Sequence, residues 1–99
     1  MVSLSDSLAE LGLTQQESAA YLAALELGFS SISDIAKKAE IKRPTAYYII
    51  EELIKKNLVS RAPKGKRMFY LAERPQNLLR NVRTQEERLV NLMPQLEAL

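Results

Sequence analysis

Three side chains with strong hydrogen-bonding capacity lie close together near the middle of the chain. Arg43 offers a planar bidentate donor, Thr45 a hydroxyl beside a methyl group, and Tyr48 a phenolic hydroxyl. Arginine matches the two acceptors on the edge of guanine, and threonine suits either an acceptor or the methyl group of thymine. We therefore expect Arg43, Thr45 and Tyr48 to read the base edges of a nucleic acid.

Cationic side chains lie on both sides of these three residues. They suit the phosphates of a polyanion, which hold a protein in place without conveying sequence. Tyr47 lies among them, and we favour a packing role with a wet hydroxyl over base reading for its ring. The residues that we expect to contact the nucleic-acid backbone are Lys38, Lys42, Tyr47, Lys64, Lys66 and Arg67.

The charges of the chain are segregated along its length. Residues 1–36 hold five acids and no Lys or Arg, residues 37–67 hold ten bases and three acids, and the whole chain carries a net charge of +2. Such segregation is typical of a protein that turns one face toward a polyanion. A solvated basic face without a ligand is the alternative: Lys55 and Lys56 could simply complement a helix dipole, and lysines in a hairpin could protect a strand edge.

Several classes of function lack the residues that they need. The chain has no Cys and no His, which removes disulfides, thiol nucleophiles, zinc sites built on these ligands and the commonest general base. No set of carboxylates, lysines or tyrosines converges either, so we expect no enzyme, no metal and no cofactor. The N-terminus lacks the features of a secretory signal, and no apolar run approaches the roughly 18 residues of a membrane span. We therefore expect a cytoplasmic, nucleoid-associated protein.

Helix signals dominate the first half of the chain. Leu4, Leu8 and Leu11 form an apolar stripe that ends at Gly12. Thr14 and Glu17 have the spacing of a capping box, which predicts a helix to about Leu27, where Gly28 ends it. A second box at Ser31 and Asp34 predicts a short helix to about Ala39. The residues of the longer helix that we expect to face the core are Ala20, Tyr21, Ala24, Leu25 and Leu27.

A third helix and a hairpin follow. Pro44 suits the first position of a helix over about residues 43–56, with Asn57 in a left-handed cap and Leu58 as its apolar contact. Residues 59–62 and 68–71 read as two short strands around a turn at 63–67. Pro75 then suits the first turn of a last helix. The inward stripe of the third helix is Ala46, Ile49, Ile50 and Leu53.

This order of elements predicts a mainly α fold with a small β-hairpin wing, the winged helix-turn-helix, followed by a long C-terminal helix. In such a fold the second helix of the helix-turn-helix lies in the major groove of duplex DNA. We expect residues 1–74 to form the DNA-binding domain and residues 75–99 a coiled-coil-like dimerisation helix.

The last helix carries an apolar repeat spaced alternately by four and three residues. Such a stripe must be buried, either against the chain's own domain or against the same helix of a second chain, and we favour pairing. Gln85 would act as a polar register element, and Pro94 should kink or break the last turns. The residues expected at the dimer contact are Leu78, Val82, Gln85, Leu89, Leu92, Leu96 and Leu99.

The chain resembles the N-terminal domain of TrmB-type transcriptional regulators, which are winged-helix proteins of archaea and bacteria. The matching segments are residues 11–17 (Leu-Gly-Leu-Thr-Gln-Gln-Glu), 21–28, 34–39 and 53–59. The resemblance implies sequence-specific binding of duplex DNA, with Arg43 at the start of the reading helix. Glu40 departs from the family's usual glycine, which would cost about 1 kcal/mol if φ there is positive. Pro44 and Thr45 also depart from the family's usual residues, so the family's base preference does not carry over. The 99 residues include no counterpart of the sugar-sensing domain of the family, so no effector can be inferred.

Together these features predict a homodimeric transcriptional regulator on a pseudo-palindromic DNA site, with two reading helices about 34–36 Å apart. Two alternatives remain open at this stage. One is a winged-helix module whose basic face binds an acidic protein, and the other is an architectural protein that binds DNA without sequence preference.

Overall fold

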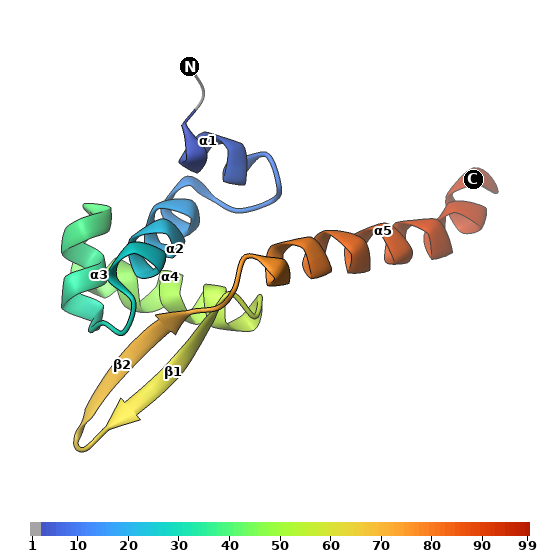
Figure 1. The fold of residues 1–99 in the computed structure, drawn as a ribbon. Coiled ribbons are helices and arrows are strands. Elements are labelled where there is room, and N and C mark those ends of the chain that lie inside the picture. The colour runs from blue at the N-terminus through green and yellow to red at the C-terminus, as the bar shows by residue number, and fades with distance from the viewer. Residues whose placement is uncertain (1–2) are drawn as a thin grey trace.

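The computed structural model describes residues 3–99, so Met1 and Val2 of the predicted first domain lie outside the described residues. The helices and strands follow the predicted order (Figure 1). They are α1 (Leu4–Ala9), α2 (Gln15–Leu27), α3 (Ile32–Ala39), α4 (Arg43–Lys55), β1 (Val59–Lys64), β2 (Arg67–Ala72) and α5 (Gln76–Glu97).

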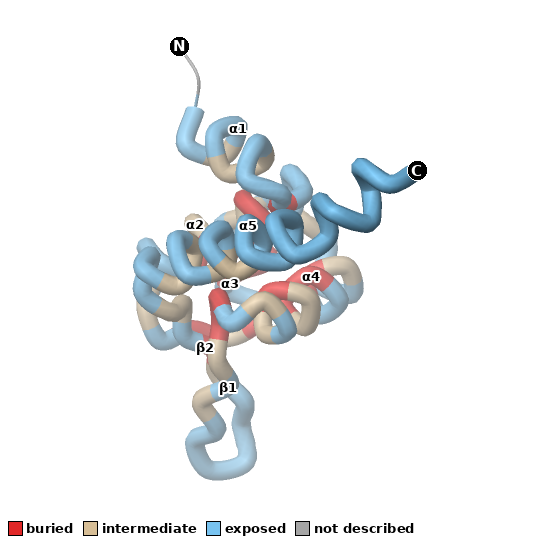
Figure 2. The backbone as a smooth tube through the Cα atoms, turned by 90° about the vertical axis from the view of Figure 1, so that its right-hand side faces the viewer, coloured by how far each residue is buried: buried red, intermediate tan, exposed pale blue. Residues whose placement is uncertain are grey.

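The core lies between α2, α3, α4 and the root of the hairpin, as the red segments of Figure 2 show. Tyr21, Ile35, Ile50 and Leu53 are among its fully buried side chains. Ala20, Ala24 and Ala46 are completely buried, and their small size lets the helices approach closely. The inward stripe predicted for α4 is confirmed, because Ala46, Ile49, Ile50 and Leu53 are all buried.

Two leucines that were predicted to face the core, Leu25 and Leu27, are instead exposed, and so are two leucines of the apolar stripe predicted in the first helix. Leu25 and Leu27 at the end of α2 are more than a third exposed, and Ala23 takes the buried place on that helix. In α1 only Leu8 packs against the core, whereas Leu4 and Leu11 face solvent. These predictions were wrong because periodicity identifies an apolar stripe but not how far along it the neighbouring elements reach.

The predicted capping box at the start of α2 is present and extends into a partly buried ion pair. The Thr14 hydroxyl accepts from the Glu17 N–H, and the Glu17 carboxylate accepts from the Thr14 N–H at 2.8 Å. The same carboxylate, whose side chain is 4% exposed, binds the Lys56 ammonium at 2.9 Å. Burial disfavours the charge of Glu17, but the Thr14 N–H and the Lys56 ammonium together outweigh it and lower the pKa of this carboxyl.

Helices α3 and α4 both end in a left-handed residue that is not glycine. Glu40 has φ 58° and Asn57 has φ 61°. At each end the residue after the left-handed one donates back to the carbonyl five positions earlier: Ile41 to Ala36 at 3.0 Å and Leu58 to Leu53 at 2.9 Å. These are Schellman caps, and the predicted cap at Asn57 and Leu58 is confirmed.

The start of α4 differs from the prediction by one residue. Arg43 is the first residue of the helix, Pro44 is the second, and Lys42 caps it without a side-chain hydrogen bond. Proline still fits, because the first N–H groups of a helix have no partner within the helix. At the start of α3, the predicted cap is present as a bond from the Asp34 N–H to the Ser31 hydroxyl.

The hairpin is longer than predicted, and its turn is shorter. The strands pair from Val59 with Ala72 out to Lys64 with Arg67, which leaves only Gly65 and Lys66 in the turn. Gly65 has φ 62°, the positive value that the first position of a type II′ turn requires. Ser30 adds a bridge to Tyr70 through two backbone hydrogen bonds, which ties the hairpin root to the segment before α3.

Helix α5 leaves the body as an arm, and most of its surface is exposed (Figures 1 and 2). The radius of gyration is 15.6 Å, against about 13 Å for a compact chain of this length. Pro75 caps the helix instead of lying in its first turn, and Pro94 does not end it, since α5 runs to Glu97. Within residues 3–99 no helix is both long and apolar enough to cross a membrane.

The left-handed conformation at Glu40 predicts the effect of a glycine there. We expect Glu40→Gly to raise the free energy of unfolding by about 1 kcal/mol, because glycine adopts positive φ without the strain of a Cβ. Denaturant unfolding measures the change. Glu40→Ala is the control, since it removes the same exposed carboxylate and keeps the Cβ. Equal stabilisation by both variants would assign the effect to charge and contradict the strain.

The lowered pKa of Glu17 predicts a loss of stability in acid. The contribution of the carboxylate is fully present above the ordinary Glu pKa of about 4.3 and is lost as the pH falls through the lowered value. At neutral pH we expect Glu17→Gln to lower the free energy of unfolding by about 1–3 kcal/mol. Unfolding measured across pH should show this difference vanish in acid, while Glu10→Gln, at an exposed position, changes stability by less than about 0.5 kcal/mol. A constant difference at every pH would refute the ionic contribution.

Candidate nucleic-acid interface

The exposed face of α4 carries most of the side chains predicted to read bases. Tyr48 is 65% exposed and Tyr47 47%, whereas Ala46, Ile49 and Ile50 on the opposite face are buried. Arg43 is exposed in the first turn, and Thr45 is half-buried. The inward stripe therefore orients the helix so that Arg43 and Tyr48 face solvent, with Thr45 at the edge of this face.

Arg43 is held against Tyr47 one turn later on α4. Its Nη2 donates to the Tyr47 hydroxyl at 3.4 Å, and its guanidinium carbon lies 5.9 Å from the ring centroid. At an exposed site this cation–π contact is worth about 0.5–1 kcal/mol. The predicted packing role of Tyr47 thus takes the form of a half-exposed ring that supports Arg43.

A hollow of about 200 Å³ brings parts of three elements together in front of Arg43; we call it the Arg43 hollow. Arg43 and Tyr47 line it from α4, Arg67 lines it from β2, and Ser31 and Ser33 line it from the start of α3. Two arginines and several residues with hydroxyl groups line this one depression, a combination that suits a phosphate. The serines were missed by the sequence reasoning; the cap signal at Ser31 placed a helix start there but gave no sign that β2 would lie opposite.

The hairpin carries its bases at its exposed far end. Lys64, Lys66 and Arg67 are all exposed around the turn, and the hairpin projects away from the helices (Figures 1 and 2). The hairpin is attached to the body by stacking of Phe69 on Phe29, with ring centroids 4.6 Å apart. The Arg67 guanidinium lies over the Phe69 ring. The aromatic stack gives the projecting strands a fixed attachment to the body.

Ion pairing divides the ten bases of residues 37–67, which we call the basic segment, into two groups. Lys38, Lys55, Lys56 and Arg61 pair with Glu26, Glu52, Glu17 and Glu51, respectively. No acidic partner lies within 4.0 Å of the others among residues 3–99. These are Lys37, Lys42, Arg43, Lys64, Lys66 and Arg67, and most of them lie at the start of α4 or at the hairpin tip.

Lys38 is the predicted backbone contact that the structure places differently from the rest. It lies on α3, and its ammonium is 3.0 Å from the Glu26 carboxylate of α2. Both side chains are exposed, so the pair is worth less than about 1 kcal/mol and a phosphate could displace Glu26. Lys38 nevertheless does not line the Arg43 hollow.

Tyr70 is a buried residue that supports the Arg43 hollow. Its side chain is 6% exposed beside Arg43 and Arg67, and burial, followed by the charge of Glu51, raises the pKa of its hydroxyl. It therefore stays neutral at physiological pH and supports the hollow as a packed ring.

Solved structures resemble this chain over most of its length. TrmBL2, described as an archaeal chromatin protein with a novel mode of DNA binding, matches with a TM-score of 0.78 and 27% identity over 96% of this chain and 37% of that chain. A multiple antibiotic-resistance repressor (MarR) of Listeria monocytogenes matches at 0.61 and 23% over 92% and 64%. A MarR family regulator of Silicibacter pomeroyi matches at 0.64 and 14% over 96% and 59%. The last two show the fold alone, a winged helix.

The chain spans about a third of the length of TrmBL2 and less than two thirds of the two MarR-type chains. No curated protein matches its sequence. The family model for the sugar-specific transcriptional regulator TrmB matches residues 8–76, which include the whole helix-turn-helix and both strands. The family model and the Silicibacter pomeroyi match are described as transcriptional regulators, the Listeria monocytogenes match as a repressor and TrmBL2 as a chromatin protein. This chain therefore belongs to the TrmB family of winged helix-turn-helix, DNA-binding transcriptional regulators.

Proposed function

We propose that this protein is a homodimeric transcriptional regulator that binds a specific site on double-stranded DNA, in the nucleoid. One observation carries the proposal: among the bases of residues 37–67, five of the six without an acidic partner within residues 3–99 lie at the exposed start of α4 or at the tip of the hairpin. When lysine and arginine side chains contact phosphates, the counterions condensed on the DNA are released into solution. This release is a large source of affinity for DNA.

In this proposal α4 enters the major groove with its first turns toward the bases. Arg43, Thr45 and Tyr48 read base edges, and Arg43 must leave Tyr47 to reach guanine. That exposed contact costs less to break than the roughly 1–3 kcal/mol that a bidentate arginine–guanine pair supplies. The contacts to the DNA backbone or minor groove come from Lys38, Lys42, Tyr47, Lys64, Lys66 and Arg67.

Residues 75–99 supply the dimer contact in this proposal, and residues 1–74 the DNA-binding domain. Leu78 packs against the core, but Val82, Leu89, Leu92 and Leu96 expose 37–54% of their surface along the arm. An exposed leucine stripe on a helix of about 33 Å is typical of a helix that pairs with a second copy. Gln85 and Leu99 complete the repeat. Two-fold pairing would present two α4 helices to successive major grooves of a pseudo-palindromic site.

Architectural binding without sequence preference is the second candidate. The observation that favours it is the likeness to TrmBL2, a chromatin protein, over 96% of this chain. The half-buried state of Thr45 points the same way, because it leaves fewer base-reading groups fully accessible. Both candidates use the same basic surface and differ in whether α4 discriminates among sequences.

We predict that duplex DNA binding separates the roles of α4 and the hairpin. Binding to a site selected from a random library and to random duplex is measured between 50 and 200 mM salt. Arg43→Ala should reduce the preference for the selected site by about 1–3 kcal/mol per half-site, because each subunit loses one bidentate base contact. Lys64→Ala should weaken both duplexes alike and lower the salt slope of the dimer by about two, one for each subunit.

Glu40→Ala serves as the control here, since it changes a charge on the turn before α4 without touching the proposed contacts. Absence of binding to any duplex at 50 mM salt would overturn both candidates. Binding without a selectable preference would favour the architectural one, and equal loss of preference from Arg43→Ala and Lys64→Ala would contradict the division of roles.

Leu89→Glu should convert the dimer into monomers, because it places a charge in the middle of the exposed stripe. Sedimentation or light scattering measures the mass. Asn91→Glu adds the same charge two residues further on, outside the repeat, and should leave the mass unchanged. A monomeric wild-type chain, or a Leu89→Glu variant of dimeric mass, would refute pairing through α5.

A further inference from the structure

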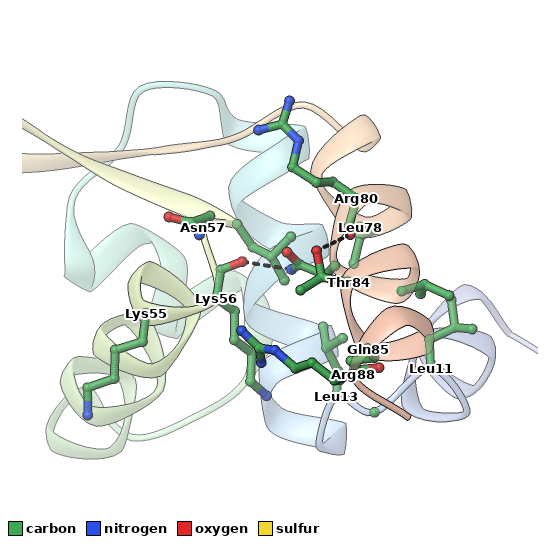
Figure 3. Close-up of a pocket in the computed structure, with 14 residues that line it drawn as sticks. Leu11, Leu13, Lys55, Lys56, Asn57, Leu78, Arg80, Thr84, Gln85 and Arg88 are labelled. Atoms are coloured by element: carbon green, nitrogen blue, oxygen red, sulfur yellow. Dashed lines mark hydrogen bonds between the residues drawn. The ribbon is translucent and has the colours of Figure 1, made fainter. Parts of the chain in front are cut away.

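A second hollow lies where α5 leaves the body, away from the proposed DNA contacts. It has a volume of about 340 Å³ and lies between the loop after α1, the end of α4 and the first turns of α5 (Figure 3). We call it the root hollow. Its volume falls within the range of small-molecule sites.

The floor of the root hollow is apolar. Leu58 is fully buried and Leu13 is 8% exposed, and Leu78 lies beside them from α5. Leu11 and Val82 stand at the margin with 49% and 37% of their surface exposed. Covering these two side chains would remove apolar surface from water, which favours a ligand with an apolar body.

The rim of the root hollow is cationic. Four bases line it, and none of its lining residues is an acid. Lys55 is paired with Glu52 and Lys56 with Glu17, whose carboxylate lies behind the hollow in α2. The other two bases, Arg80 and Arg88, form no ion pair within residues 3–99.

Arg88 is the cation that faces the space. In Figure 3 its side chain extends from α5 across the hollow toward the end of α4, whereas Lys55 and Arg80 point away. An arginine over an apolar floor suits a carboxylate, because its planar donors can hold both oxygens. The backbone nearby is fixed, since the Asn81 amide donates to the Lys56 carbonyl at 2.7 Å.

We propose that the root hollow binds a small organic anion, with a flat apolar body against Leu11, Leu78 and Val82 and a carboxylate on Arg88. Such a ligand contacts α5 and the end of α4 at once. It would therefore bias the direction in which the arm leaves the body. The site requires neither DNA binding nor a dimer.

The test uses 2-naphthoate as the anion and 2-naphthamide as its neutral analogue, each titrated into the ¹⁵N-labelled chain. We expect naphthoate to shift the amide signals of Gly12, Leu13, Asn57 and Asn81, and naphthamide to shift them at least about tenfold more weakly. Arg88→Gln should weaken naphthoate binding by about tenfold, while Arg83→Gln, on α5 but outside the hollow, should leave it unchanged.

Any one of four results would overturn the site, and three of them concern how the compounds bind. They are equal binding of both compounds, equal binding of naphthoate to the wild-type and Arg88→Gln chains, and shifts confined to the exposed stripe from Leu89 to Leu96. Absence of any shift at millimolar naphthoate would do the same. The spectra themselves show whether each variant is folded.

Discussion

The end of α4 is the joint at which the other elements of the molecule are fastened. A left-handed Asn57 stops the helix and turns Leu58 into the core, where it is fully buried. The Lys56 ammonium reaches back to Glu17 at the start of α2, and the Lys56 carbonyl accepts from Asn81 of α5. One short turn thus sets the position of α4 against α2, of the hairpin after α4, and of the arm. A change in this turn would move all of them together.

This joint explains how the charges of the chain are divided. Among the bases of residues 37–67, the two nearest to it, Lys55 and Lys56, are paired with carboxylates and stabilise the fold, as does Arg61 in β1. The bases furthest from it, at the start of α4 and at the hairpin tip, have no acidic partner among the described residues. A net charge of +2 hides this division, because neutralisation is concentrated where elements meet. The surface left for a polyanion is smaller than the basic segment, and it lies on the two projecting edges.

Local chemistry made most of the fold predictable, and distant contacts account for what was missed. The capping box at Thr14, the caps at Ser31 and Asn57 and the buried stripe of α4 each depend on neighbours a few residues away, so the sequence contains them. The ion pair of Glu17 with Lys56 and the bridge of Ser30 to Tyr70 join residues about forty apart, and no spacing rule reports them. The same holds for the candidate site. The exposure of Arg43 and Tyr48 could be predicted from the helix period. That Arg43 and Arg67 line the same hollow could not be predicted, because it depends on how the hairpin folds back toward α4.

In the proposed dimer, the specificity for a DNA site would depend on how rigidly the arm α5 is attached to the body. A dimer selects a site with fixed half-site spacing only if each α4 is held at a fixed angle to the paired helices, because a loose root would let the two reading helices settle on many spacings. Asn77 and Asn81 donate to the carbonyls of Asn57 and Lys56 just after α4, at 2.7 Å each, and Leu78, between them in the sequence, packs on the core. These contacts span a single turn of α5 beside an open hollow, so they fix the arm weakly compared with a packed core. The same weakness suits both a chromatin-like binder, which tolerates many spacings, and a regulator whose spacing is tightened when the hollow is filled. In the proposed dimer, the stiffness of this root would set how strictly the spacing of the half-sites is selected, while the side chains of α4 would set the preference for bases within each half-site.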